Sequence, residues 1–355
     1  MNVLFLAPRF HPDVGGVERH LLGLSRTLTA RGHHVFVVTP GEGPSREEFE
    51  GITILRFSRA RSRPARTRVG RLVENVRMWP RILRLLRGVP PPDLVHGHDF
   101  AFLWGLPAVV GRFGWTPRYV TFHGIEGDVA AGWAVLGRRV SAALANGKIC
   151  VGTFMDRWYG TRADAVTFGA IDGEPVPPDY PSRTTDILYV GRLSSDVALD
   201  RYLEGLERVA KSGERVRWVL YGEGPLGTWI RTEGARRGLD IRLEGVTHEP
   251  ERVFARHEIA LAAGYLGILE AIQAGCFVVA LARSPLREDY YRSHPCASHG
   301  LAVASSLEAF ADLVVTTRRD PRARNEAVSS GQRIVARMTW DALADTYERV
   351  WGAVA

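Results

Sequence analysis

The feature that most constrains the fold is a repeated alternation of short apolar segments with amphipathic helical patterns. In the first half, NVLFLAP at residue 2 is followed by a helical pattern that places Leu21, Leu24 and Leu28 on one face. The alternation resumes with DILYVGR at residue 186 and continues to CFVVALA at residue 276. Continuous apolar strands separated by helices are typical of parallel sheets covered on both faces. The sequence therefore predicts an α/β protein with two such units in series.

A proline-rich connector marks the predicted division between the two units. Four prolines and few apolar residues lie between positions 169 and 186, and 355 residues are too many for one ordinary core. We expect an N-terminal domain over 1–170, a linker over 171–186, a C-terminal domain over 187–335 and an amphipathic helix over 336–355. The apolar residues of that helix, which include Leu343 and Tyr347, predict core packing, with the N-terminal domain as one place for it.

Composition excludes several classes of protein. Apolar residues make up 45% and charged residues 24%, as in globular domains, and no apolar stretch reaches the ~18 residues that span a bilayer. The first residues lack the basic lead of a signal peptide. Three widely spaced cysteines without a CxxC motif predict reduced thiols and no metal site. We therefore expect a cytoplasmic protein.

The net positive charge of the chain comes entirely from its first half. Residues 1–170 hold 23 Lys and Arg against 13 Asp and Glu, whereas the remainder holds 23 against 26. Between Arg56 and Arg87, eleven arginines face one acid, Glu74. Such a segment attracts phosphates, anionic membranes or nucleic acid. Nucleic acid is the weakest of these readings, because the segment lacks a regular interleaving of aromatic residues and has no known reader motif.

Candidate ligand-binding residues follow the predicted strands, where parallel sheets bind ligands. Glycines at a helix start leave backbone N–H groups open to a phosphate. An arginine can hold a phosphate with paired donors, a histidine can contact a hydroxyl or phosphate, and a carboxylate near a helix start suits two ribose hydroxyls. The plainer alternatives are tight turns, a structural histidine, a solvated arginine and a first-turn acid. The candidates are Gly15, Gly16, His123 (with His96 and His98 as weaker ones), Arg192, Gly222, Gly224 and Glu270.

Taken in order, these segments resemble glycosyltransferase family 4. The matching pieces span nearly the whole chain, from APRFHPDVGGVERHLLGLSRTLTARGHHVFVVTP through DLVHGHD, VTFHG, ILYVGRL, VLYGEGP and RLEGV to GILEAIQAG. The resemblance implies the GT-B fold, with two Rossmann-like domains whose parallel sheets face each other across an inter-domain cleft. It also implies retaining, metal-independent transfer from a nucleotide-diphosphate sugar, without a cofactor.

The same resemblance assigns roles to the matched positions. His123 would lie near the transferred sugar and Arg192 would bind the diphosphate, which makes these two the catalytic candidates. Gly15 and Gly16 would lie near the donor phosphates, and Glu270 would bind the ribose. Gly222 and Gly224 complete the predicted donor site through backbone contacts.

Two positions depart from the family pattern. Val197 stands where the family usually has lysine, and Ala262 stands where it usually has a second glutamate. Arg283 and Arg287 are candidate replacement cations. The alternatives are a sugar-nucleotide epimerase of the GT-B fold and a weak or inactive donor-binding homologue, whereas an oxidoreductase is disfavoured because GxGxxG is missing.

The arginine-rich segment raises the question of the acceptor. A basic amphipathic helix can rest on an anionic bilayer, which would make the protein peripheral at the inner face of the membrane and its acceptor lipid-linked or anionic. Equally, the helix can pack on the N-terminal sheet with its arginines solvated. Pro80 should kink or divide it. Its apolar residues are Val69, Leu72, Val73, Val76, Trp79, Ile82, Leu83 and Leu86.

Overall fold

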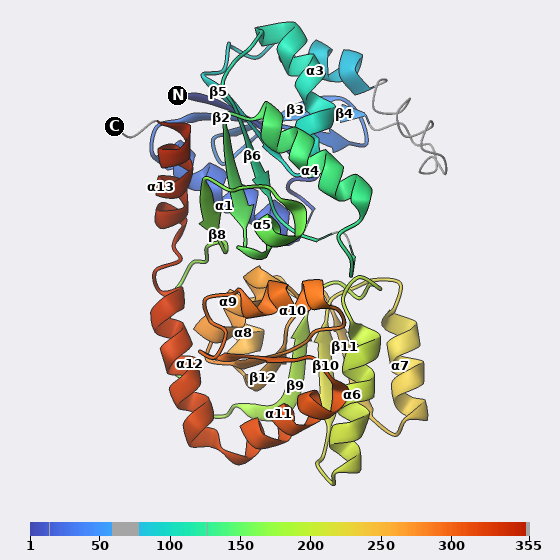
Figure 1. Cartoon of the computed structure of the whole chain (residues 1–355). Helices are drawn as coiled ribbons and strands as arrows, with labels where there is room; N and C mark the ends of the chain where they lie inside the picture. Colours follow the sequence, from blue (N-terminus) through green and yellow to red (C-terminus); the bar gives the residue numbers. More distant parts are fainter. Residues whose placement is uncertain (14, 59–77, 126, 353–355) are drawn as a thin grey trace. The chain divides into compact units, whose positions relative to one another are not determined.

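The computed structural model describes residues 1–13, 15–58, 78–125 and 127–352, which form two compact units (Figure 1). The N-terminal unit comprises Met1–Glu126, Ala130–Thr167 and Trp340–Ala355. The C-terminal unit comprises Gly127–Val129 and Phe168–Thr339. Both contain a largely parallel sheet with helices between the strands, so the predicted pair of Rossmann-like α/β units is confirmed.

The N-terminal unit is built on an eight-stranded sheet of order β3-β4-β2-β1-β5-β6-β7-β8. All neighbours are parallel except β3 and β4, which form an antiparallel edge hairpin. The sequence did not reveal β3, because its SREEF segment is mostly exposed and lacks apolar alternation. The strands are β1 (Asn2–Leu6), β2 (His34–Gly41), β3 (Ser45–Phe49), β4 (Ile52–Ser58), β5 (Leu94–His98), β6 (Arg118–Phe122), β7 (Gly147–Val151) and β8 (Ala165–Thr167).

Helices between these strands bury their apolar residues on the sheet. In α1, Leu21, Leu24 and Leu28 are completely buried, as their spacing predicts. α1 follows extended Gly15 and ends before Gly32, whose φ of +84° suits a residue without a Cβ. The helices of the unit for which both ends are described are α1 (Gly16–Ala30), α3 (Ala101–Phe113), α4 (Gly132–Leu144), α5 (Phe154–Tyr159) and α13 (Trp340–Trp351).

The arginine-rich segment is described only in part. Residues 78–86 are helical, and Ile82 and Leu86 are completely buried in a cluster with Leu4 and Val38 from the sheet. For these residues, the packing alternative holds. The predicted apolar positions from 69 to 76 lie outside the described part. Pro80 lies inside it, within the helical residues 78–86, and does not interrupt them.

The C-terminal unit has a six-stranded, fully parallel sheet of order β11-β10-β9-β12-β13-β14. Its strands are β9 (Thr184–Val190), β10 (Arg217–Tyr221), β11 (Asp240–Gly245), β12 (His257–Leu261), β13 (Phe277–Leu281) and β14 (Leu301–Ala304). The expected linker therefore ends earlier than 186, since its last three residues belong to β9. The helices are α6 (Leu199–Lys211), α7 (Gly227–Arg236), α8 (Pro250–Phe254), α9 (Tyr265–Gln273), α10 (Pro285–Arg292), α11 (Leu307–Arg319) and α12 (Pro321–Val335).

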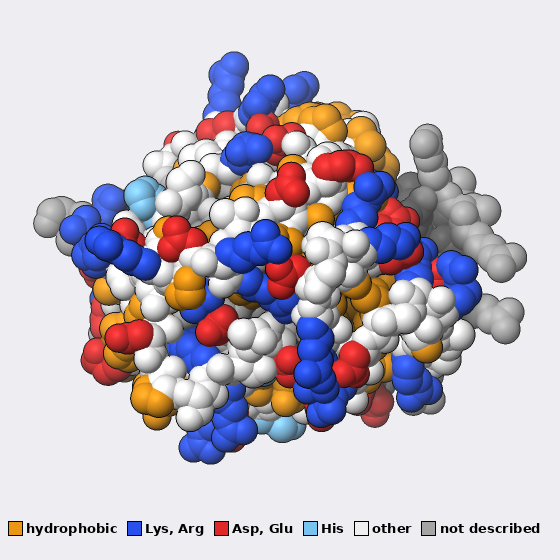
Figure 2. All heavy atoms as spheres, turned by 90° about the horizontal axis from the view of Figure 1, so that it is seen from below, with side chains coloured by type: hydrophobic (Ala, Val, Ile, Leu, Met, Phe, Trp, Pro, Cys, Tyr) orange, Lys and Arg blue, Asp and Glu red, His pale blue; other side chains and the backbone are white. Residues whose placement is uncertain are grey.

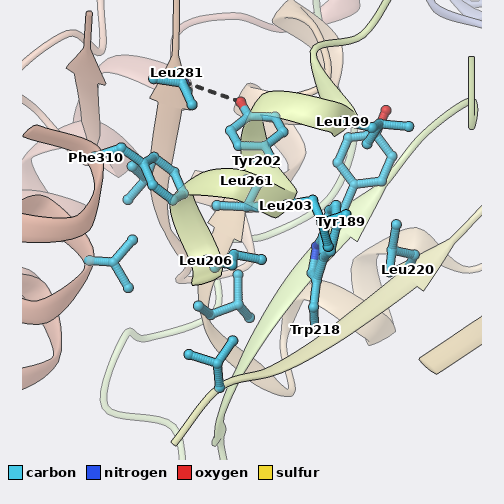
Figure 3. Packing of buried hydrophobic residues seen from close by; sticks show 14 of the residues in the cluster. Tyr189, Leu199, Tyr202, Leu203, Leu206, Trp218, Leu220, Leu261, Leu281 and Phe310 are labelled. Atoms are coloured by element: carbon cyan, nitrogen blue, oxygen red, sulfur yellow. Dashed lines mark hydrogen bonds between the residues drawn. The ribbon is translucent and has the colours of Figure 1, made fainter. Parts of the chain in front are cut away.

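An apolar core with few polar atoms holds the C-terminal unit together. Figure 3 shows Phe310 beside Tyr202 of α6, with Leu206 and Trp218 in the same buried cluster. The Tyr202 hydroxyl donates to the Ala262 carbonyl at 2.9 Å and accepts from the Leu281 amide at 3.3 Å. This buried hydroxyl thereby ties α6 to β13 and to the segment after β12, as a buried polar group requires.

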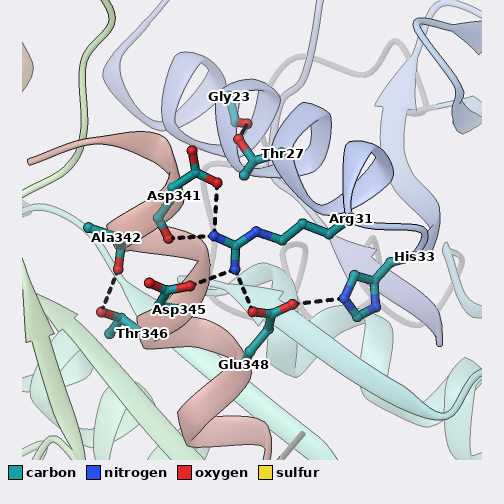
Figure 4. A network of polar contacts seen from close by, with 9 residues as sticks. All are labelled: Gly23, Thr27, Arg31, His33, Asp341, Ala342, Asp345, Thr346 and Glu348. Atoms are coloured by element: carbon teal, nitrogen blue, oxygen red, sulfur yellow. Dashed lines mark hydrogen bonds and ion pairs between the residues drawn. The ribbon is translucent and has the colours of Figure 1, made fainter. Parts of the chain in front are cut away.

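The last helix, α13, packs on the N-terminal unit against α1, β7 and β8. Figure 4 shows the Arg31 guanidinium at the end of α1 donating to Asp341, Asp345 and Glu348 of α13 at 2.6 to 2.8 Å. Glu348 also contacts His33 at 2.9 Å. One arginine with three carboxylates fixes the register of the two helices more firmly than a single exposed pair would.

In the described part of the chain, no helix is both long enough and apolar enough to cross a membrane.

Candidate functional site

The central strand of the C-terminal sheet brings the predicted site residues of this unit to one edge. Strand order reverses between β9 and β12, and open parallel sheets bind ligands beyond the carboxyl ends of strands at such a point. Arg192 follows β9, and α9 begins at Tyr265 after β12, with Gly264 as its N-cap. Arg192 and the start of α9 therefore belong to the same edge, and the first amide of α9, that of Tyr265, donates to the Tyr290 hydroxyl at 3.0 Å.

Two glycines allow the loop after β10 to lie against the loop after β9. Gly222 has a φ of +142°, and a Cβ there would lie 1.8 Å from the Gly191 carbonyl oxygen. Gly224 has a φ of +155°, and its Cβ would lie 2.3 Å from the Leu193 carbonyl oxygen. Only glycine tolerates this approach. The predicted grouping of Arg192 with Gly222 and Gly224 is thus present in the structure.

Three arginines gather around the turn that follows Arg192. Arg192 pairs with Asp196 at 2.8 Å, and Arg287 donates to the Asp196 carbonyl at 2.6 Å. Arg283 donates to the Ser195 carbonyl at 3.1 Å and pairs with Asp128 at 2.6 Å. We call Arg192, Arg283 and Arg287 the arginine cluster. Its two later members come from the segment after β13, so the ends of two strands, β9 and β13, supply this part of the site.

The arginine cluster carries a net positive charge. Its three guanidiniums face two carboxylates, and the Arg192 side chain remains 61% exposed. Burial disfavours ionisation of Asp196, but hydrogen bonds and charge from Ser194 and Arg192 outweigh it and lower the pKa of that carboxyl. Asp196 is therefore ionised at neutral pH and orients Arg192. The remaining charge and the exposed guanidinium donors suit a phosphate-like anion.

Glu270 lies on α9, but not where the sequence suggested. The helix begins at Tyr265 and has no acidic residue in its first turn, so Glu270 falls in the second turn. The expected stabilisation by the helix dipole is therefore wrong, because that effect fades within the first turn. Glu270 is half-buried, and its two carboxylate oxygens can still accept from a pair of hydroxyls.

The two positions that depart from the family pattern are buried and apolar. Val197 is 7% exposed and packs in the core cluster beside Leu193 and Leu199. Ala262 is 2% exposed, and its backbone amide donates to the Val279 carbonyl at 3.0 Å. Neither position offers a charge at the sheet edge, so any second cation there must come from elsewhere in the fold.

In the N-terminal unit, His98 is the last residue of β5, and His123 directly follows the adjacent strand β6. His98 Nδ1 and His123 Nε2 are 2.7 Å apart, and the two rings are stacked. The His123 amide donates to Asp99 at 2.9 Å, which fixes the backbone where the strand ends. Gly15 and Gly16, which precede and begin α1, belong to the same unit. A Cβ at Gly16 would meet nothing within 4 Å, so the start of α1 is uncrowded there.

His20 is a member of this cluster that the sequence reasoning missed. Its ring lies edge-on to the His123 ring at 4.7 Å, and its Nε2 contacts the Tyr347 hydroxyl at 2.9 Å. The available signal was a polar residue on the apolar face of the first helix, one turn before Leu24. Burial lowers the pKa of His20 to about 4 and holds the pKa values of His98 and His123 well below their usual range. These imidazoles are therefore neutral at neutral pH.

Within the described residues, no three His, Cys, Asp or Glu side chains are grouped so as to hold a metal ion. The three cysteines are unpaired and buried. Burial raises the pKa of each thiol to about 12, so none is a nucleophile at neutral pH.

Comparison with known families gives one assignment for both halves of the chain. Residues 14–168 match the model described as Glycosyltransferase Family 4, and residues 184–320 match the model described as Glycosyl transferases group 1. A phosphatidyl-myo-inositol mannosyltransferase of Mycobacterium leprae is 25% identical, with 100% of this chain and 97% of the relative covered. A GDP-mannose-dependent phosphatidylinositol dimannoside mannosyltransferase of Mycobacterium tuberculosis is 26% identical over the same shares of the two chains.

Solved structures with the same fold include a sucrose-phosphate synthase from Thermosynechococcus elongatus, with a TM-score of 0.77, 17% identity and 100% of both chains covered. The Anabaena protein HepE, in a complex with UDP and glucose, gives a TM-score of 0.70 at 15% identity over 99% of both chains. These neighbours show the GT-B fold.

Proposed function

The chain belongs to glycosyltransferase family 4 and is a nucleotide-sugar-dependent glycosyltransferase of the GT-B fold; we propose that it transfers the sugar with retention and without a metal ion. The observation that carries the proposal is the arginine cluster at the carboxyl edge of the C-terminal sheet. It provides, from protein side chains alone, the positive charge that a leaving diphosphate requires.

In this proposal, the arginine cluster binds the donor diphosphate. Arg192 is the exposed member, while Arg283 and Arg287 are held by the backbone of residues 195 and 196 and supply the charge that the family places at position 197. Gly222 and Gly224 let the backbone approach the nucleotide, and Glu270 accepts from the ribose hydroxyls. Gly15 and Gly16 contribute the start of α1 to the donor phosphates.

The chemistry then needs positioning and charge stabilisation from the protein. The bond from the anomeric carbon to the diphosphate oxygen breaks while the acceptor oxygen bonds to the same face of that carbon. The acceptor proton passes to the departing diphosphate, so no side chain has to serve as general base. Arg192 stabilises the negative charge that grows on the leaving group. His123, neutral and at the end of β6, hydrogen-bonds the transferred sugar.

We further propose a lipid-linked or otherwise anionic acceptor and a peripheral position at the cytoplasmic face of a membrane. By name, the mycobacterial relatives act on phosphatidylinositol and its dimannoside. On α4, Trp133, Leu136, Val140 and Leu144 recur at helical spacing and are exposed, which gives the N-terminal unit an apolar helix face. A face of this kind suits insertion at a bilayer surface.

Vesicle co-sedimentation tests the membrane contact. The protein should sediment with anionic vesicles, lose them as salt screens the surface charges, and lose them on Leu136→Glu. Val246→Glu is the matched control, because Val246 is also an exposed apolar residue but belongs to the C-terminal unit. Equal recovery with neutral and anionic vesicles, or none with either, would favour a soluble acceptor.

The donor site is tested by calorimetry with UDP, GDP, ADP and dTDP sugars, followed by a transfer assay with and without EDTA. Arg192→Ala and Glu270→Ala should each weaken the selected donor about tenfold or more, because charge-assisted hydrogen bonds are worth ~1.5–3 kcal/mol. Arg292→Ala removes an arginine in a comparable i,i+4 ion pair of the same unit and should leave affinity unchanged. Unchanged affinity in both site variants, with the fold intact, would remove the assignment. EDTA should leave the rate unaltered.

A second candidate function is donor binding without transfer. Buried, apolar Val197 and Ala262 favour it, since both replace charged residues of the family pattern. Donor affinity without hydrolysis or transfer would support it. Release of an epimerised sugar would instead indicate the epimerase alternative.

A further inference from the structure

A continuous chain of buried hydrogen bonds runs from α13 through the N-terminal sheet to α1. Trp351 Nε1 lies 2.9 Å from His96 Nδ1, and His96 Nε2 lies 2.8 Å from Thr121 Oγ1. Thr121 Oγ1 lies 2.8 Å from the Tyr347 hydroxyl, which lies 2.9 Å from His20 Nε2. Each of the five side chains is at most 7% exposed. Four contacts therefore join α13, β5, β6 and α1.

The donors and acceptors along this chain can point in one direction only. Trp351 Nε1–H can only donate, so His96 accepts at Nδ1 and carries its proton at Nε2. His96 then donates to Thr121. The Thr121 hydroxyl is fully buried, so its proton must be donated in a hydrogen bond, and the acceptor is the Tyr347 hydroxyl. Tyr347 in turn donates to His20 Nε2, which places the His20 proton on Nδ1.

The same reasoning fixes the tautomer of His123. His98 Nε2 is buried and has no hydrogen-bond partner among the described residues. A bare lone pair there costs less than a stranded N–H group, so the His98 proton sits on Nδ1 and is donated to His123 Nε2. His123 consequently carries its proton on Nδ1. No partner among the described residues takes up that proton, which leaves it as the donor the cluster can offer to a ligand.

His123 is held between two neighbours in the cluster. His98 bonds its Nε2, and the His20 ring lies edge-on to its face with an interplanar angle of 86°. The orientation of the His20 ring is set by its bond to Tyr347, which comes from a helix that begins at residue 340. A displacement of α13 would therefore reach His123 through a single intermediate ring.

We propose that α13 is a working part of the N-terminal site, in which Tyr347 and Trp351 are positioning residues that fix the tautomer of His20 and, through it, the orientation of the His123 ring. This inference rests on the proposed function, in which His123 contacts the transferred sugar. It gives the C-terminal helix a role in turnover that its distance in sequence from His123 conceals.

Two substitutions, each of which removes one hydroxyl that bonds α13 to the sheet, distinguish a positioning role of α13 from simple packing of the helix on the unit. Tyr347→Phe removes one hydroxyl and interrupts the chain. Tyr119→Phe also removes one buried hydroxyl that bonds α13, since Tyr119 donates to the Trp351 carbonyl at 3.1 Å, but it leaves the chain intact. Tyr347→Phe should lower kcat about tenfold, the factor that corresponds to one hydrogen bond, with the Kd of the bare nucleotide diphosphate unchanged. Tyr119→Phe should retain kcat.

Nitrogen-15 NMR of the histidine rings tests the tautomers directly, with His→Gln variants to assign the signals. The expected pattern is Nε2–H for His96 and Nδ1–H for His20, His98 and His123, all neutral at pH 7. Tyr347→Phe should change the His20 signal. Thr121→Ser should retain the pattern and Thr121→Val should lose it, which keeps the test decisive if one variant fails to fold.

The outcomes are distinct. An Nε2–H tautomer of His20 in the native protein, or equal falls in kcat for Tyr347→Phe and Tyr119→Phe, overturns the inference. If the native protein transfers no sugar from any donor, the proposed function fails, whereas the NMR signals still decide whether α13 sets the tautomers of the cluster.

Discussion

The two units share one architecture but place opposite kinds of polar group at the carboxyl edge of the sheet. In the N-terminal unit, neutral imidazoles are buried and joined by directional hydrogen bonds, as between His98 and His123. In the C-terminal unit the interior is apolar, and charge is kept at the rim, where backbone carbonyls hold Arg283 and Arg287. The same scaffold can thus offer neutral donors for hydroxyls in one unit and fixed cations for phosphates in the other.

The outer surface differs from the arginine cluster in how its charges are arranged. Figure 2 shows one face of the molecule on which Lys and Arg side chains are interspersed with Asp and Glu, without a large field of one sign. In the C-terminal unit, pairs such as Arg319 with Glu214 and Arg208 with Glu308 are exposed, and each contributes little to stability. In the proposed donor site, by contrast, the Arg283 and Arg287 side chains are only 18% and 11% exposed and are held by fixed partners.

The largest effect that tests this contrast is the loss of stability that we expect in the N-terminal unit at acidic pH. In the folded protein, burial lowers the pKa of His20 from its ordinary 6.5 to about 4. The stability that depends on neutral His20 is therefore complete above pH 6.5 and is lost as the pH falls towards 4. Each such histidine lowers the free energy of unfolding by ~1.4 kcal/mol for each pH unit between its pKa in the unfolded chain and its pKa in the folded protein. The N-terminal unit has four of them, namely His20, His96, His98 and His123, whereas the C-terminal unit has His257 and His294 among the described residues.

Urea unfolding at several pH values between 7 and 4.5, with proteolytic fragments assigned to each unit, measures this difference. The N-terminal unit should lose stability first. Equal losses in both units would mean that buried histidines do not distinguish them.

The second effect concerns glycines. Gly222→Ala should destabilise the C-terminal unit by about 2 kcal/mol or more and weaken the donor, because its Cβ would meet the Gly191 carbonyl at a φ of +142°. Gly16→Ala in the N-terminal unit meets no atom within 4 Å and should leave stability unchanged or slightly raised. Thermal unfolding of both variants checks the pair, and a neutral Gly222→Ala would show that the two loops do not need this close approach.

The third effect is on donor affinity. Arg287→Ala should weaken nucleotide-diphosphate binding roughly tenfold, since it removes a charge-assisted contact worth ~1.5–3 kcal/mol. Isothermal calorimetry measures it, with Arg252→Ala as a control in an exposed ion pair of the same unit. Equal affinity in the two variants would confine the phosphate site to Arg192 and Arg283.

The last expected effect, of about the same size, is on turnover and concerns the N-terminal unit. His123→Ala should lower kcat roughly tenfold, the value of one hydrogen bond, while the Kd of the bare nucleotide diphosphate stays the same. Steady-state kinetics and calorimetry on one preparation check both halves of the statement. A full-rate variant would make His123 a structural residue.

Local patterns predicted much of the fold and part of the site. The apolar run of the DILYVGR segment and the helical spacing after Leu199 identify β9 and α6 almost to their ends. Arg192, Gly222 and Gly224 could be grouped because the carboxyl ends of adjacent parallel strands meet at one edge. The helix that carries Glu270 was predicted to start within one residue of Tyr265, but Glu270 lies beyond its first turn, where the helix dipole no longer stabilises a carboxylate.

The sequence by itself determined the two α/β units, the family and the residues that stand at the strand ends, because these depend on hydrophobic period and on glycine within a few positions. Only the tertiary structure decided which of those residues acquire partners. His20 meets Tyr347 across 327 positions, and Arg287 meets the Asp196 carbonyl across 91. Such contacts depend on the path of the whole chain, in which α13 returns to the N-terminal unit. The N-terminal domain was one place expected for this helix, but no local pattern specifies the contacts that it makes there, so the tautomer of His20 could not be predicted from the sequence.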